Sequence, residues 1–180
     1  MLKLLKEISH ILYIKMLILK SNAYNLHKVY EKHYGVKFGK NVRITGKRIS
    51  FGGEPYLVEV GNNVTIAPGV KFQTHDGGIG IFRNEYPGIN VYGKIKIGNN
   101  VFLGEESMIM YNVTIGDNVI IGARSVVTKN IPSNSVAVGV PAKVIKSIEE
   151  YKFNSLNKAV FIYETKPQKR KAEIISKLKQ

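Results

Sequence analysis

His75 is the residue in the central part of the chain whose side chain is best suited to proton transfer. An imidazole takes up and releases a proton near neutral pH, so histidine often serves as a general base. The other histidines, His10, His27 and His33, lie in an N-terminal stretch with a helical pattern. Asp76 follows directly and could orient the ring or form a turn, although adjacent strand residues point to opposite faces. A single histidine in a repeat can also be purely structural, so the role of His75 has to be inferred from the elements around it.

Residues 77–92 follow this pair and interrupt a regular pattern. They contain four glycines and one proline, all of which break strands and helices. Twenty-five positions separate Phe72 from Ile97, which is four units of six plus one, so the phase of the repeat slips within this interval. We therefore expect residues 77–92 to form a loop outside the regular structure. Loops of this kind usually carry function.

The repeat that the loop interrupts is clearest over residues 97–127. Its first position is aliphatic, and its fifth is small or branched. The first positions are Ile97, Leu103, Ile109, Ile115, Ile121 and Val127, and the fifth positions are Val101, Ser107, Val113, Val119 and Ser125. A period of six matches neither an amphipathic helix nor a single strand, and indicates a solenoid of short strands that each place two side chains in one core. The following Gly98, Gly104, Gly116, Gly122, Asn100 and Asn118 are predicted to supply the positive φ that tight corners need.

Helical patterns flank this solenoid. Apolar residues recur every three or four positions near the N-terminus, and the C-terminal stretch looks helical with a break at Pro167. We expect a helical segment at 1–35, the solenoid domain at 36–146 and a basic helical tail at 147–180. The first helix is too often charged to cross a membrane, and no signal peptide is evident. It either packs on the solenoid or a neighbouring subunit, or rests on an anionic membrane surface.

Charge and composition narrow the classes of partner. The 180 residues suffice for one domain with terminal attachments, and the chain has no cysteine, which excludes disulfides and thiolate chemistry. Of the net charge of +14, residues 1–40 carry +6 and residues 143–180 carry another +6. Basic ends suit nucleic acid, an anionic membrane or acidic small molecules, or merely keep the protein in solution. No nucleic-acid-binding signature is present, so we expect no nucleic-acid partner.

The run IGARSVVTKNIPSNSVAVGVPAKVIK at 121–146, together with the preceding repeats, resembles the hexapeptide-repeat acyltransferases. The resemblance is strongest to the galactoside, maltose and xenobiotic O-acetyltransferase branch, which includes capsule and O-antigen acetyltransferases. It covers about residues 36–146. It implies an all-β solenoid, a left-handed parallel β-helix that departs from the usual right-handed crossover rule. It also implies a homotrimer with active sites between subunits, acetyl-CoA as cosubstrate and no metal.

The same resemblance assigns roles to single residues. It implies that His75 is the catalytic base, which would deprotonate a sugar hydroxyl as this attacks the thioester. Asp76 is a second catalytic candidate. The coenzyme candidates are Gly104 and Glu105 near the thioester, Ala123 along the pantetheine, Thr128 and Lys129 at the adenine, and Lys143 and Lys146 near the phosphates. Relatives often have arginine at the last two positions, so point charges replace bidentate contacts here.

We therefore expect an acetyl-CoA-dependent O-acetyltransferase acting on a sugar of a bacterial surface polysaccharide or its precursor. Phe82, Tyr86 and Tyr92 could stack on a pyranose, and Arg83 could meet an acidic group. We expect the protein in the cytoplasm, with peripheral contact at the inner face of the membrane. The main alternative is an N-acetyltransferase of a nucleotide-linked amino sugar, because a free amine needs less help from a base.

Three other readings fit the residues less well. A γ-type carbonic anhydrase needs three histidines for zinc, and the solenoid has one. A serine acetyltransferase would have a longer N-terminal helical domain. A non-enzymatic solenoid would have no reason to combine His75, the loop at 77–92 and the Thr128-Lys129 pair. The sequence does not identify the sugar or the hydroxyl.

Overall fold

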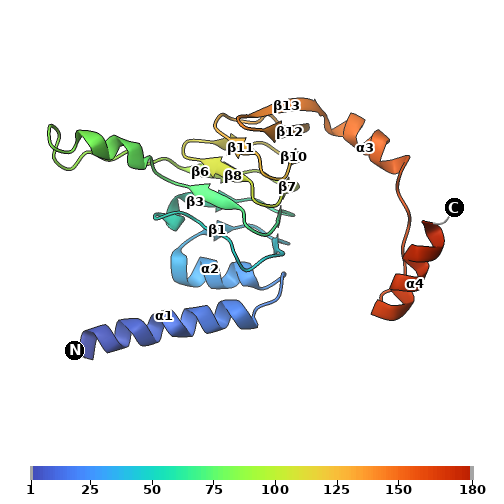
Figure 1. The fold of residues 1–180 in the computed structure, drawn as a ribbon, viewed down its shortest axis with the longest axis horizontal. Coiled ribbons are helices and arrows are strands. Elements are labelled where there is room, and N and C mark those ends of the chain that lie inside the picture. Colours follow the sequence, from blue (N-terminus) through green and yellow to red (C-terminus); the bar gives the residue numbers. More distant parts are fainter. Residues whose placement is uncertain (1, 179–180) are drawn as a thin grey trace. The chain divides into compact units, whose positions relative to one another are not determined.

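The computed structural model describes residues 2–178 and divides the chain into two units, at 2–148 and from Glu149 onward. The first unit contains two helices, a parallel β-solenoid and a protruding loop (Figure 1). Its helices are α1 (Leu2–Lys20) and α2 (Leu26–Tyr34), with short 3-10 turns η1 (Pro55–Leu57) and η2 (Gly77–Phe82). Its strands are β1 (Lys37–Phe38), β2 (Arg43–Ile44), β3 (Val58–Val60), β4 (Thr65–Ile66), β5 (Lys71–Gln73), β6 (Ile95–Ile97), β7 (Val101–Leu103), β8 (Met108–Met110), β9 (Thr114–Ile115), β10 (Val119–Ile121), β11 (Val126–Val127), β12 (Ser135–Gly139) and β13 (Ala142–Ser147).

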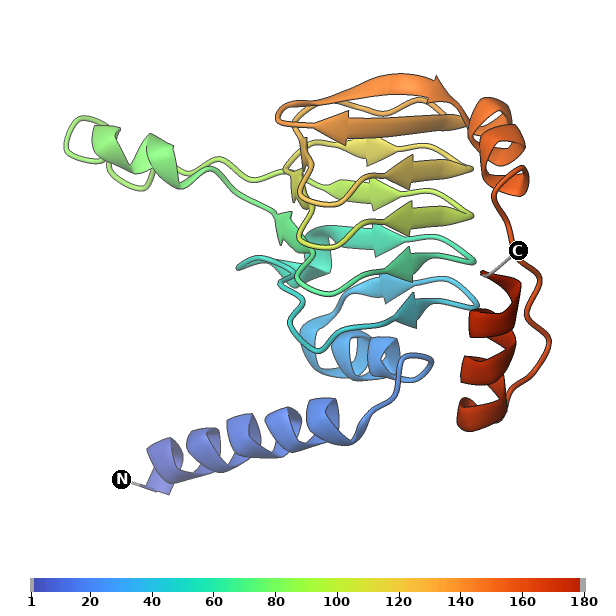
Figure 2. The same cartoon turned by 45° about the vertical axis from the view of Figure 1, so that its right-hand side comes forward.

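The strands form three sheets that run alongside one another (Figure 2). Their orders are β1-β3-β6-β9, β13-β12-β10-β7-β4-β2 and β11-β8-β5, and all pairs are parallel except the terminal β12–β13 hairpin. Each turn from β3 to β11 contributes one strand to each sheet. Residues that meet on successive regular turns, such as Asn99 and Asp117, are 18 positions apart. The chain is therefore a parallel solenoid with three sheets, which agrees with the solenoid that the period of six predicts.

The core is built from the two inward positions of each six-residue unit. All first-position residues from Ile97 to Val127 are at most 4% exposed, and all fifth-position residues, including Ser107 and Ser125, are at most 2% exposed. Burying a branched aliphatic side chain stabilises a fold by about 1.5–3 kcal/mol. The repeat thus encodes a continuous apolar column in which successive coils stack.

The corners of the solenoid correct one expectation. The asparagines do take positive φ, with Asn100 at 56° and Asn118 at 55°, but the glycines that follow the aliphatic positions do not. Those glycines are needed for close approach instead. A Cβ on Gly98 would lie 2.5 Å from the Asp117 carboxylate and 2.7 Å from the Gly116 carbonyl carbon of the next coil. Glycine therefore lets adjacent coils touch, while asparagine turns the chain.

The loop leaves the solenoid after β5 and returns before β6. Residues that stack across this turn are 37 positions apart, as for Asn62 and Asn99, in place of 18. Figures 1 and 2 show the segment, which contains η2, projecting from the side of the solenoid. Its aromatic and aliphatic side chains are exposed, with Ile81 at 78% and Tyr86 at 60%. The loop therefore adds no residues to the core of its own chain.

The two N-terminal helices differ in how they pack. α2 closes the end of the core through buried Leu26 and Tyr30, and the Tyr30 ring lies 4.8 Å from that of Phe51. α1 contacts α2 on one side, where the rings of His10 and His33 are 5.9 Å apart. Among the α1 side chains that the structure describes, only Ile14 is buried. No helix within residues 2–178 is long and apolar enough to cross a membrane.

The second unit contains α3 (Ile148–Leu156) and α4 (Pro167–Lys177). The first residue of α3, Ile148, is still part of the first unit. α4 begins at Pro167, which is favoured at a first helical position because it needs no hydrogen-bonded N–H there. The Glu173 carboxylate accepts hydrogen bonds from the backbone of Tyr163 and Glu164 and pairs with Lys177 at 3.0 Å. These contacts fold the linker back on α4, in agreement with the two helical pieces expected on either side of the proline.

Candidate active site

His75 stands where the loop leaves the solenoid, just beyond the end of β5. The strand alternation continues past Gln73, so Thr74 is fully buried while the His75 side chain is 35% exposed. His75 forms an antiparallel bridge with Tyr92, and the flanking backbone bonds, from Asp76 N to Val91 O and from Gly93 N to Thr74 O, are 3.0 and 2.9 Å. These backbone contacts hold the two ends of the loop together beside the imidazole.

The partner of the imidazole is Glu54, which lies one coil earlier. Its Oε2 is 2.9 Å from His75 Nδ1 and accepts a hydrogen bond of 2.7 Å from Thr74 Oγ1. The Glu54 N–H in turn donates to Thr74 Oγ1 at 3.3 Å. The Glu54 side chain is 18% exposed. Glu54 precedes Pro55, the first residue of η1, so this short turn fixes where the carboxylate points.

The electrostatics of this pair determine which ring nitrogen can act as a base. The hydrogen bond from Thr74 holds the pKa of Glu54 below its usual value of 4.5, the contact with His75 acts in the same direction, and burial opposes both. Glu54 is therefore ionised at neutral pH and can only accept hydrogen bonds. Since Nδ1 must then carry the proton, the lone pair of the neutral ring lies on Nε2. This tautomer is the one that a general base needs.

Asp76 does not orient the imidazole in this geometry. Its Oδ1 accepts a hydrogen bond of 2.8 Å from Gly78 N, which caps the start of η2, and its Oδ2 lies 3.4 Å from the Tyr111 hydroxyl. The reason is the strand alternation noted in the sequence, which turns adjacent side chains apart. The positioning role considered for Asp76 therefore falls to Glu54, and Asp76 itself shapes the base of the loop.

A cleft of about 240 Å³ opens over the imidazole. Its walls come from the residue before η1, from the segment after β5 and from the loop, and its lining residues are Glu54, His75, Asp76, Gly77, Arg83, Asn90, Val91 and Tyr92. Two of the predicted acceptor residues lie here. The Tyr92 ring meets that of His75 edge-on at 6.3 Å, and the Arg83 guanidinium donates to Asn90 Oδ1 at 3.3 Å.

The other two predicted acceptor residues lie outside this cleft. Phe82 and Tyr86 are 43% and 60% exposed on the projecting part of the loop. Both are carried by the loop beyond the segment that is clamped to the solenoid. Their rings are therefore available to contact a molecule other than their own chain.

The predicted coenzyme residues divide between the two edges of the β11-β8-β5 sheet. Because these strands are parallel and in register, the residues before them share one edge and the residues after them share the other. Gly104 and Glu105 precede β8, and Ala123 precedes β11. A Cβ on Gly104 would lie 2.5 Å from Ala123 N, so the two positions stack directly. Neither Gly104 nor Ala123 carries a large side chain.

The remaining predicted positions lie elsewhere on the same chain. Thr128 and Lys129 follow β11 at the edge that also bears His75, and both are exposed. Lys143 and Lys146 lie on β13, paired in register with Val138 and Val136. One chain thus brings His75, Asp76, Arg83 and Tyr92 together and leaves the coenzyme candidates spread over two edges and one end.

Sequence reasoning missed Glu54 and Thr74. Glu54 lies in the segment Gly52-Gly53-Glu54-Pro55, which does not follow the six-residue repeat. The first coils are 22 residues long, as the bond between Lys40 N and the Asn62 side chain shows, and Glu54 precedes His75 by 21. A search for polar residues about one coil before the histidine would have found it.

Comparisons with known proteins agree on one family. Residues 94–129 match the model for the bacterial transferase hexapeptide, described as six repeats. The chain is 48% identical over 168 residues to protein CapG of Staphylococcus aureus, covering 93% of this chain and 98% of that one. A galactoside acetyltransferase in complex with coenzyme A is 30% identical with a TM-score of 0.57, covering 86% of both chains. A maltose O-acetyltransferase from Clostridium difficile 630 is 30% identical with a TM-score of 0.51, covering 80% of this chain and 87% of that one.

Proposed function

The chain belongs to the hexapeptide-repeat acyltransferases, and from this premise we propose that it transfers the acetyl group of acetyl-CoA to a sugar hydroxyl. The acceptor is a bacterial surface polysaccharide or its precursor. Family membership also supports a left-handed sense for the coils, and the segments at 1–35, 36–146 and 147–180 are part of the proposal.

The observation that carries the proposal is the Glu54–His75 pair at the mouth of the cleft. A sugar hydroxyl is a weak nucleophile and needs a base as it attacks the thioester carbon. His75 Nε2 takes the hydroxyl proton while the oxygen forms the new C–O bond. The tetrahedral intermediate then expels the coenzyme thiolate, which recovers the proton from the imidazolium to leave as the thiol. Glu54 stays ionised throughout and stabilises the imidazolium.

The same pair supports O-acetylation over the N-acetyltransferase alternative. A neutral amine attacks a thioester without prior loss of a proton, so it gains less from a base with a fixed tautomer. The buried Thr74 hydroxyl donates to the Glu54 carboxylate oxygen that also contacts His75, so the two residues together position the imidazole. Asp76 acts through the shape of the loop base in this proposal.

The split of the coenzyme candidates over two edges supports a homotrimer. The β5 strand has three residues, so the edges of this sheet are separated by about 10 Å at 3.3 Å per residue. A groove between neighbouring copies could bring one copy's His75 edge to another copy's Gly104, Glu105 and Ala123. In this arrangement Thr128, Lys129, Lys143 and Lys146 meet the adenine and phosphate end of acetyl-CoA.

The projecting loop supports the same assembly. The loop extends past the chain's own solenoid (Figure 2), where a neighbouring copy and its acceptor would lie, and its Phe82 and Tyr86 are exposed. Aromatic faces stack well on the apolar faces of a pyranose. Arg83 and Tyr92, which line the His75 cleft, would position the ring whose hydroxyl reacts.

The test of the function is thiol release from acetyl-CoA against a panel of free sugars, nucleotide sugars and capsule oligosaccharides. We expect acetyl ester formation on at least one sugar, detected by its lability in mild base. Acetylation of amines alone would replace this proposal with the N-acetyltransferase, and hydrolysis of acetyl-CoA at a rate independent of every acceptor would overturn both.

The exposed side of α1 supports peripheral contact with an anionic membrane at the cytoplasmic face. Six large apolar side chains on this helix are 40–67% exposed: Ile8, Ile11, Leu12, Tyr13, Met16 and Leu19. Lys6, Lys15 and Lys20 accompany them. An apolar face with flanking lysines is the pattern of a helix that lies in the membrane interface. A trimer would present three such helices, and their weak contacts would add.

A further inference from the structure

A second and larger hollow, of about 570 Å³, lies at the edge of the solenoid where β5 begins. Its lining residues are Arg48, Ile49, Ser50, Gly69, Lys71, Glu106 and Arg124. Three of them are cations and one is an anion, so the hollow is net positive. No residue of this basic hollow was singled out by the sequence analysis, and it shares no lining residue with the His75 cleft.

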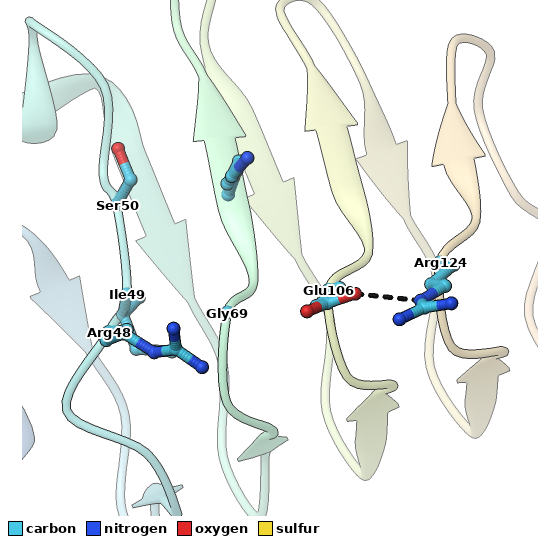
Figure 3. A pocket seen from close by; sticks show the side chains of 7 residues that line it. Arg48, Ile49, Ser50, Gly69, Glu106 and Arg124 are labelled. Atoms are coloured by element: carbon cyan, nitrogen blue, oxygen red, sulfur yellow. Dashed lines mark hydrogen bonds and ion pairs between the residues drawn. The ribbon is translucent and has the colours of Figure 1, made fainter.

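The hollow is built from corners stacked on successive coils. Gly69 N donates to Arg48 O at 2.8 Å, Glu106 N to Pro68 O at 2.9 Å, and Arg124 N to Glu105 O at 2.7 Å. Figure 3 shows Arg48, Gly69, Glu106 and Arg124 in one row across these coils. Their spacing is therefore set by the solenoid itself, which makes this a rigid site.

The corner residues of the hollow break the pattern of the other corners. Within residues 2–178, the other non-glycine residues with positive φ are all asparagines: Asn41, Asn63, Asn100, Asn112, Asn118 and Asn134. Glu106 and Arg124 take the same conformation, both with φ of 57°. This left-handed conformation costs more free energy for glutamate or arginine than for asparagine. Strained positions of this kind are concentrated at functional sites.

The charged groups remain available to a ligand. Arg124 Nε lies 2.8 Å from Glu106 Oε2, and the two side chains are 82% and 46% exposed. This contact engages one guanidinium nitrogen and leaves two that can face an oxyanion. Gly69 keeps the middle of the row open, since a Cβ there would lie 2.9 Å from Glu106 Cγ.

The outward face of β5 connects the basic hollow to the catalytic histidine. Lys71, Gln73 and His75 alternate with buried Phe72 and Thr74, so all three point to the same outer side. Lys71 lines the hollow and His75 lines the cleft. Four residues of extended chain span about 13 Å. One ligand could therefore reach from the hollow to the imidazole across this face.

We propose that the basic hollow binds an oxyanion of the acceptor, a carboxylate or a phosphate, about 13 Å along β5 from the hydroxyl that His75 activates. This rests on the proposed sugar O-acetyltransferase function and names the class of acceptor. The acceptor is an acidic glycan or a phosphate-linked sugar that is long enough to span this distance. Arg48 and Arg124 hold the anion by paired N–H donors, and Lys71 adds a point charge.

Equilibrium binding to the native protein tests the site without requiring turnover. Calorimetric titrations would use D-glucose, D-glucuronate and D-glucose 1-phosphate as probes. We expect one or both charged sugars to bind at least about tenfold more tightly than glucose, since charge-assisted hydrogen bonds are the strong ones. The two charged probes separate a carboxylate from a phosphate ligand. Equal affinity for all three sugars would overturn the proposal.

Substitutions locate the bound anion. Arg48→Gln and Arg124→Asn should each weaken binding of the preferred charged sugar about tenfold. Asparagine is chosen at 124 because it tolerates the positive φ of that corner. Glu106→Asn should tighten binding several-fold, because it removes the one anion of the hollow, whereas a merely structural role would predict a loss. Lys94→Gln, an exposed lysine outside the hollow, should change nothing.

The remaining outcomes separate this proposal from the proposed function. If Arg48→Gln and Arg124→Asn weaken acetyl-CoA binding instead, the hollow holds coenzyme phosphate and the proposal fails. If neutral sugars are acetylated as fast as charged ones by these variants and by the parent protein, the function stands and the acceptor class is wrong. If charged sugars bind in the hollow and no sugar is acetylated, the anion site stands and the proposed function falls.

Discussion

Glu54 and His75 are 21 positions apart in the sequence, and their side chains meet at 2.9 Å because one turn of the solenoid separates them. Thr74 completes the contact by donating to the same carboxylate oxygen. The solenoid thus uses the stacking of its coils, the same property that builds its core, to hold an imidazole in one tautomer beside an open cleft.

Replacing His75 by alanine should lower kcat by roughly 10²- to 10⁴-fold, the range expected for loss of a positioned general base. Binding of acetyl-CoA and the oligomeric state should remain close to those of the parent protein. Steady-state kinetics and light scattering would measure both. A variant with near-normal kcat would show that another group removes the proton.

Glu54→Gln should reduce kcat by about tenfold or more, because an amide can donate to Nδ1 and so allow the unproductive tautomer. Raising the pH should not restore the rate, since the fault lies in the position of a proton on the ring. The matched control is Glu59→Gln, which breaks the exposed ion pair with Lys37 at 2.9 Å. Equal kcat values for the two variants would show that Glu54 has no role in the mechanism.

The lowered pKa of Glu54 also predicts how stability depends on pH. A carboxyl group whose pKa is lower in the folded protein stabilises it fully above the unfolded value, near 4.5, and loses this effect as the pH falls through the folded value. The difference in melting temperature between the parent protein and Glu54→Gln should therefore be constant near neutrality and shrink below about pH 4.5. A difference that persists unchanged into acid would assign the effect to packing.

The double variant Lys143→Ala and Lys146→Ala should raise the KM for acetyl-CoA with little change in kcat. Contacts to the distant phosphates bind the ground state and the transition state alike, so they contribute to KM alone. Both residues lie on β13, well outside the His75 cleft. An unchanged KM would place the coenzyme phosphates on other cations.

Vesicles that contain anionic lipid should sediment the protein at low salt and release it at high salt, because screening weakens the attraction of lysines to the surface. Replacing exposed Leu12 and Leu19 of α1 by serine should abolish this binding while leaving buried Ile14 and the contact with α2 in place. Equal binding to neutral and anionic vesicles, or to neither, would instead favour burial of α1 against a neighbouring copy.

The six-residue repeat and its interruption are enough to predict the solenoid, its inward residues and the place of the loop. Ile97 and Leu103 point inward because each is the first residue of a six-residue unit. This position can be recognised from the adjacent residues along the chain. The loss of phase between Phe72 and Ile97 likewise marked residues 77–92 as excluded from the core. His75 was identifiable for the same local reason, since it is the one histidine of the solenoid and it borders that loop.

The residues that meet across coils could be identified only in the folded chain. The coil length is 22, 37, 18 or 16 residues at different points, as the stacked pairs at Asn62, Asn99, Asp117 and Ser133 show, so no fixed period predicts such contacts. That is why Glu54 replaced Asp76 as the partner of His75. It is also why Gly98 proved to serve close approach of two coils, and why Arg48 and Arg124 could be recognised as one site.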